Sequence, residues 1–288
     1  MERSLKARLG AVVAALVMAS ASAPLGAVVL SMGDLNVVIN DANGAIQNAA
    51  FRGVEYYNVD TQVSDYGFQS FDDTTTFVRF TETGAITGPG TGAVSSVVGG
   101  GTSATVTGTY EGLAFTRTYT LVGGNSIQID MSLARVIGAG GPSTVRLFDT
   151  ADPDQGGHGF NATSNIVSGG ALATRVGPPN DGFFVLWSSG EADAAFGFGA
   201  GTSPFGLGIM TGDQLNTFLE TPFNPGGAIA DIGMAVGEDL RIPSEGPGHF
   251  SYVQTFGALV TVPEPASLAL LGLALAGLAI ARRRHASH

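Results

Sequence analysis

Apolar and polar residues alternate in short runs along much of the chain, and glycine, asparagine, aspartate or proline separates the runs. The clearest runs are residues 115–121, where Phe, Tyr and Leu take odd positions, and residues 127–133, where every odd position is apolar. Each run has one apolar and one polar face, as a half-buried strand does. With turn residues at 111–112 and 123–125, this pattern predicts a three-stranded antiparallel meander over residues 105–136.

The rest of the body shows the same pattern more weakly. Further strands are expected at residues 35–40, 45–51, 54–57, 77–81, 145–148, 183–188, 196–200, 207–210, 232–240 and 249–262. Asn43-Gly44 predicts a tight turn after the first of these runs. The Gly/Thr/Ser-rich residues 84–101 indicate a surface connection, with a mobile binding loop as the alternative, and residues 212–220 allow a short helix. Many short strands predict an all-β fold, an antiparallel β-sandwich or its supersandwich variant, in one domain over residues 28–260.

An uncharged apolar segment, residues 266–281, stands near the end of the chain. The turn before it consists of Pro263, Glu264 and Pro265. The basic cluster after it consists of Arg282, Arg283 and Arg284. A helix of this length spans about 24 Å, and snorkelling arginines can make up the difference from a bilayer core of roughly 30 Å. Residues 261–288 therefore predict a transmembrane helix with cytoplasmic arginines; a buried helix with a basic tail is the alternative.

The first 27 residues have the three parts of a secretory signal peptide. A basic start at residues 3–8 precedes an apolar run at residues 11–19, and small residues follow. Signal peptidase is expected to cut after Ala21 or Ala27, because cutting after Ala23 would leave Pro24 next to the bond. A retained N-terminal anchor is the alternative. This signal helix and the C-terminal helix flank the predicted sandwich.

Removing the two terminal segments makes the body more acidic. The whole chain carries a net charge of −11, but residues 27–262 contain seven arginines and 22 acidic residues, which gives −15. Such a charge argues against binding to nucleic acid or to anionic lipid. The chain has no cysteine, so disulfides and thiolate metal sites are excluded.

The C-terminal segment resembles the PEP-CTERM sorting domain of Gram-negative bacteria. Val262, Pro263, Glu264 and Pro265, the short Leu/Ala/Gly span and the three arginines occur in the order typical of that class. The resemblance implies that an exosortase, a membrane-embedded cysteine protease, recognises the motif and removes the tail. It also implies transient anchoring in the inner membrane, delivery to the cell surface or extracellular matrix, and a host that makes exopolysaccharide.

The body also resembles, by pattern, the galactose-mutarotase-like supersandwich domains. The resemblance rests on residues 44–46, 51–56 and 252–257, together with the predicted meander. The sugar-epimerising members of that class use a histidine pair and a late glutamate. The only histidines of the body, His158 and His249, do not match those positions, so the resemblance does not extend to epimerase activity.

Three aspartates near residue 150 are the candidate metal ligands. Asp149, Asp152 and Asp154 lie within six residues and precede two glycines. Carboxylates suit calcium, which takes six to eight oxygen ligands. The spacing does not follow the EF-hand loop, and an acidic turn begun by Asp-Pro explains the same residues. Calcium is the only cofactor that the sequence suggests.

No catalytic motif is present, and no catalytic residue is assigned. His158 beside the aspartates is a weak candidate base, and Asp72-Asp73 and Glu238-Asp239 are expected to be solvated carboxylates. The aromatic residues of positions 56–71 indicate core packing, with sugar stacking as the alternative. The sequence therefore predicts a non-enzymatic protein of the surface or matrix, associated with exopolysaccharide or biofilm. A carbohydrate-binding or carbohydrate-active protein is the alternative.

Overall fold

The computed structural model describes residues 26–57, 64–153, 162–177, 180–200, 226–227, 229–230 and 232–259. Every regular element among them is a β-strand, and every strand pairing is antiparallel. The predicted all-β antiparallel fold is therefore confirmed. The two predicted terminal helices lie outside the described residues, as do residues 207–210 and the short helix expected at 212–220.

The largest sheet has nine strands, and the last described strand of the chain lies at its centre. In spatial order its strands are β17 (Ile229–Ala230), β13 (Ala162–Val167), β14 (Gly170–Arg175), β15 (Phe183–Ser188), β19 (Gly248–Ala258), β11 (Ser126–Arg135), β10 (Leu113–Val122), β9 (Ser103–Tyr110) and β8 (Gly92–Gly100). The predicted meander is confirmed as β9, β10 and β11, which pair in sequence order.

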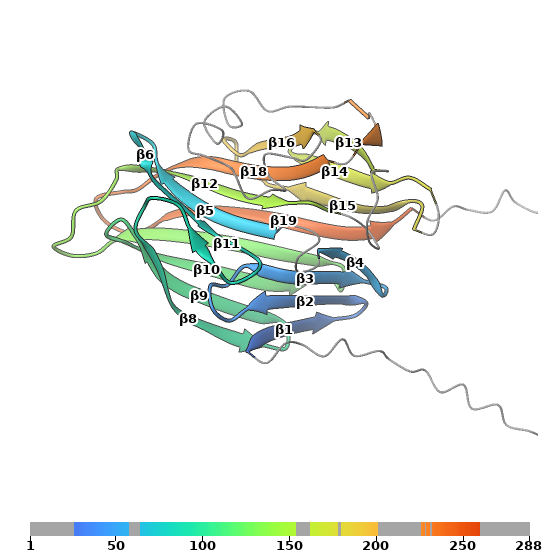
Figure 1. The fold of residues 1–288 in the computed structure, drawn as a ribbon, viewed down its shortest axis with the longest axis horizontal. Coiled ribbons are helices and arrows are strands. Elements are labelled where there is room, and N and C mark those ends of the chain that lie inside the picture. Colours follow the sequence, from blue (N-terminus) through green and yellow to red (C-terminus); the bar gives the residue numbers. More distant parts are fainter. Residues whose placement is uncertain are drawn as a thin grey trace, which may run out of the picture.

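Two smaller sheets complete the fold (Figure 1). The six-stranded sheet runs in the order β16 (Ala195–Ala200), β18 (Ile232–Arg241), β12 (Thr144–Ala151), β5 (Ser64–Ser70), β6 (Asp73–Phe80) and β7 (Ile86–Thr87). The four-stranded sheet runs in the order β1 (Ala27–Met32), β2 (Leu35–Asn40), β3 (Ile46–Phe51) and β4 (Val54–Tyr57).

Both smaller sheets pack on the same face of the nine-stranded sheet. Phe115 on β10 contacts Phe68 of the six-stranded sheet, with ring centroids 5.1 Å apart. Phe256 on β19 contacts Tyr56 of the four-stranded sheet at 4.9 Å. The strand registers place Phe115 and Phe256 on one face, because residues two apart along a strand point the same way. The hydrophobic core therefore lies between two layers, and one of these layers is divided into two sheets.

The expected turn at Asn43-Gly44 joins β2 and β3. The Gly44 N–H donates to the Asn40 carbonyl at 2.7 Å, and the Asn40 N–H donates to the Ala45 carbonyl at 2.9 Å. Gly44 alone takes a positive φ here, at 77°. The turn also serves the core, because the Gly44 carbonyl accepts a hydrogen bond from the Tyr119 hydroxyl of β10.

The glycine-rich residues 84–101 were expected to form a surface connection between strands, and that expectation is wrong. They contain β8, one of the two edge strands of the nine-stranded sheet, which pairs with β9 along its length. The register shifts between Val94 and Ser96, so the apolar positions of β8 do not keep a period of two. Val94 and Val97 nevertheless both pack against the core.

Candidate functional site

Two of the three predicted calcium ligands can be located. Asp149 lies in β12, and Asp152 follows the end of that strand, whereas Asp154 lies outside the described residues. His158, the weak candidate base, also lies outside them. Within the described part of the chain, no group of three or more histidine, aspartate or glutamate residues is placed to hold a metal ion. Calcium binding by the three aspartates stays a prediction.

The Asp149 carboxylate forms an ion pair inside the protein. Both of its oxygens accept hydrogen bonds from the Arg117 guanidinium of β10, one of them at 2.9 Å. The two residues are 2% and 7% exposed, and they connect the nine-stranded sheet to the six-stranded sheet. Burial raises the pKa of Asp149, and the charge of Arg117 acts in the opposite direction. The Asp149 carboxylate is therefore part of a structural ion pair with Arg117.

Tyrosines enclose the Arg117 side chain. The Arg117 Nε donates to the Tyr119 hydroxyl at 2.6 Å, and the guanidinium lies 4.4 Å from the ring centre of Tyr66. The Tyr66 hydroxyl donates to the Asn43 carbonyl at 2.6 Å. A buried cation needs such compensation, because losing its water shell costs far more than one hydrogen bond returns. The network therefore fixes how the three sheets sit together.

The clustered aromatic residues of positions 56–71 pack mainly inside the protein. Tyr56, Tyr57, Tyr66 and Phe68 are each at most 1% exposed, so core packing is the correct interpretation for these four rings. Phe71 is 45% exposed, and the Arg146 guanidinium lies 4.6 Å from its ring centre.

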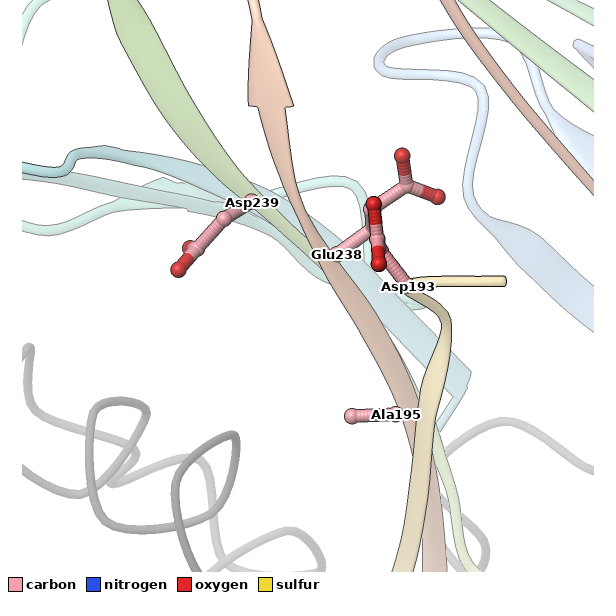
Figure 2. A pocket seen from close by; sticks show the side chains of 4 residues that line it. All are labelled: Asp193, Ala195, Glu238 and Asp239. Carbon is pink, nitrogen blue, oxygen red and sulfur yellow. The ribbon is translucent and has the colours of Figure 1, made fainter. Parts of the chain in front are cut away.

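A small acidic pocket opens beside β16 and β18. Asp193, Ala195, Glu238 and Asp239 line it, and its volume is about 300 Å³ (Figure 2). Asp193 lies in the turn before β16, and the other two carboxylates are neighbours on β18. Figure 2 shows Asp239 directed away from Glu238 and Asp193. The Asp239 carboxylate accepts a hydrogen bond from Arg146 Nε at 2.8 Å, so its charge is paired.

Glu238 was expected to be solvated, and that expectation is wrong. The residue is only 9% exposed, and its Oε2 atom is buried without a hydrogen-bond partner among the described residues. Burial, together with the smaller effect of the negative charges of Glu191, Asp193 and Asp239, raises the pKa of Glu238 from 4.5 to about 7. A carboxyl group with this pKa exchanges its proton near neutral pH.

The alternation of apolar and polar residues along β10 and β18 indicates that Arg117 and Glu238 are buried. Arg117 has an odd number in the run where Phe115, Tyr119 and Leu121 form the apolar face. Glu238 likewise falls in phase with the apolar residues on either side of it in β18. A charged residue in phase with an apolar face is a candidate for a buried, paired or functional group. From the sequence alone, Glu238 was expected to be solvated, and Arg117 was not singled out.

The predicted sorting segment lies beyond the last described strand, outside the described residues. Residues 261–284 match the family model of the PEP-CTERM protein-sorting motif. The match includes the residues singled out in the sequence: Pro263, Glu264, Pro265, Arg282, Arg283 and Arg284. A PEP-CTERM motif implies an exported protein that an exosortase sorts. The described residues include no helix that could span a bilayer.

Comparison of the fold with solved structures returns carbohydrate-active enzymes at low similarity. The chain is 10% identical to heparan sulfate lyase HepC from Pedobacter heparinus, with a TM-score of 0.42, and it covers 34% of that protein. It is 12% identical to the heparinase III BT4657 gene product, with a TM-score of 0.40 and 33% of that chain covered. These matches cover 80% and 79% of this chain. The chain thus spans about a third of the length of either protein.

A candidate aldose 1-epimerase from Escherichia coli K12 matches over its whole length. The identity is 9%, the TM-score is 0.44, and the match covers 81% of this chain and 99% of the epimerase. No curated protein matches the sequence. At this level of identity and structural similarity, the comparisons assign neither a substrate nor a catalytic residue.

Proposed function

We propose that the β-domain is the mature, non-enzymatic part of a protein that is delivered to the cell surface or extracellular matrix. The single observation that carries this proposal is the PEP-CTERM match at residues 261–284, directly after the last strand. Signal peptidase removes the N-terminal segment, and an exosortase then cuts near Pro263, Glu264 and Pro265. The released domain associates with exopolysaccharide in the matrix.

The described interior supports a structural role for the domain. Asp149, the candidate ligand with both carboxylate oxygens bonded, is engaged by Arg117 between two sheets. Four of the clustered aromatic rings are buried in the core, where they stabilise the fold and offer no surface for a sugar. An acidic, exported domain with a hydrophobic core and a buried ion pair is suited to persist as a matrix component.

The mass of the intact protein tests this proposal. Mass spectrometry of protein from the envelope and the medium should give a chain that begins near Ser22 or Val28 and ends between residues 262 and 265. The variant Glu264→Ala should retain the tail and stay in the membrane fraction, whereas Glu245→Ala, in a surface loop, should be processed normally. Wild-type protein that keeps its three terminal arginines in the membrane fraction would contradict the proposal.

Carbohydrate binding is the second candidate function, and the exposed ring of Phe71 favours it. The Arg146 guanidinium lies over one face of this ring, so the opposite face is the one that can stack on a sugar ring. Capture of the protein by polysaccharide from the same bacterium, and its loss in Phe71→Ala, separates this function from a purely structural one.

A further inference from the structure

Glu238 lies on a face of β18 whose neighbouring residues are apolar. Met234, Val236 and Leu240 share its face of the strand and are at most 6% exposed. Glu238 lies opposite Leu147 of β12, and Val236 lies opposite Asp149, so this face points toward the nine-stranded sheet. An apolar side chain at position 238 would satisfy the pattern, so the carboxylate needs another explanation.

No described group compensates the charge of Glu238. No described residue forms a hydrogen bond or ion pair with its carboxylate, although Glu238 is only 9% exposed and lines the pocket. Arg117 is engaged by Asp149, and Arg146 is engaged by Asp239. A buried carboxylate without a partner is strongly unfavourable, and proteins usually resolve this with a proton, a cation or a metal ion.

Other negative charges near the pocket make the binding of a cation there more favourable. Asp193 lines the pocket beside Glu238, and Glu191 precedes it by two residues in an exposed segment. Neither carboxylate forms an ion pair with a described residue. Glu238, Asp193 and Glu191 therefore place negative charge at or near one small volume. Asp239, whose carboxylate is paired with Arg146, is directed to the other side of β18 (Figure 2).

We propose that this pocket binds a small organic cation with a primary ammonium group, and that Glu238 and Asp193 are its anionic ligands. An ammonium group is compact and has three N–H donors, so it can contact two separate carboxylates. A divalent metal ion fits less well, because calcium needs six to eight oxygens and the described carboxylates do not form a group that could hold a metal. The volume of about 300 Å³ is at the lower end for ligand pockets, which suits a small molecule.

Calorimetric titration of the full-length protein with putrescine, an aliphatic diamine, tests this proposal. Butane-1,4-diol has the same carbon chain without charge and should not bind. Glu238→Gln keeps the shape of the side chain and removes its charge, so putrescine affinity should fall at least tenfold. Asp193→Asn should weaken binding by a smaller factor, because Asp193 is exposed and water screens its charge.

Glu245→Gln is the matched control, since it also removes one negative charge but lies in the exposed connection before β19. This control should bind putrescine like the wild type. Unchanged binding by both Glu238→Gln and Asp193→Asn would overturn the proposal, and so would equal binding of the diol. Binding of calcium chloride that depends on Glu238, without binding of putrescine, would also overturn it. The sorting proposal is unaffected by any of these results, because processing is measured by mass.

Discussion

At the scale of single residues, Gly44 shows how closely the β2–β3 turn fits the core. A Cβ atom at this position would lie 2.3 Å from Val106 Cγ2, and φ is 77°. We expect Gly44→Ala to lower the free energy of unfolding by about 2–5 kcal/mol, from backbone strain and overpacking together. Gly53 has a φ of 75° and no atom within 4 Å of the added Cβ, so Gly53→Ala should cost only the strain. Urea unfolding of both variants checks this, and equal losses would contradict the role of the contact.

A second prediction at this scale concerns Glu238 and the pH dependence of the free energy of unfolding. Its pKa is about 7 in the folded protein, against an ordinary value of 4.5, because of burial and the charges of Glu191, Asp193 and Asp239. Below pH 4.5 the carboxyl is protonated in both the folded and the unfolded chain, so it carries no penalty. As pH rises toward 7 the unfolded chain ionises first, so this residue lowers the free energy of unfolding by about 1.4 kcal/mol per pH unit. Above pH 7 the Glu238 carboxyl is ionised in both the folded and the unfolded chain, so this residue lowers the free energy of unfolding no further.

The variant Glu238→Gln isolates this effect. The difference in unfolding free energy between the variant and the wild type should grow in favour of the variant from pH 4.5 to 7, and then level off. Other buried acids, such as Asp65 and Asp149, titrate in both proteins and cancel in the difference. Chemical denaturation at a series of pH values provides the measurement. Parallel stability profiles for the two proteins would show that Glu238 titrates normally.

At the scale of elements, Arg117 and Asp149 join β10 to β12 across the core. Removing one partner leaves the other charge buried, so Arg117→Met or Asp149→Leu alone should cost about 3–5 kcal/mol. The double variant replaces both charges by apolar groups and should cost much less than the sum of the two. A double-mutant cycle from denaturant unfolding measures this coupling, and additive losses within about 0.5 kcal/mol would exclude it.

Individual strands also show how much of this fold the alternation of apolar and polar residues predicts. Strands with an unbroken period of two, such as β10 and β11, were predicted almost to their ends, because burial of one face determines the pattern. β8 was missed, since its bulge interrupts the period and its glycines lower the strand propensity. The split of one layer into two sheets was not predictable, because pairing between distant strands leaves no mark in any single segment.

The candidate site was less predictable than the fold. The terminal sorting motif is local in sequence, so its residues could be identified directly. The pocket combines the turn before β16 with β18, which are more than 40 residues apart, and its carboxylates become a group only when these strands pair. Glu238 was judged from its acidic neighbour Asp239, although its phase within β18 already indicated burial.

At the scale of the whole molecule, β19 holds the nine-stranded sheet together. It pairs with β15 on one side and with β11 on the other. A chain that ends at Pro247 lacks this strand, so β13–β15 lose their connection to the meander. We expect such a chain to be unfolded or aggregated, and a chain of residues 28–260 to give a cooperative thermal transition. Circular dichroism and hydrogen exchange make the comparison; a cooperative transition in the shorter chain would contradict the central role of β19.

The place of β19 also has a consequence for the order of events during export. A polypeptide that crosses a membrane from its N-terminus delivers residues 248–258 after all the other strands. The central gap of the largest sheet therefore stays open until the sorting segment is about to follow, and pairings so distant in sequence form slowly. The sheet therefore cannot be complete before the segment next to the tail has crossed, so the domain closes no earlier than the cleavage motif reaches the membrane.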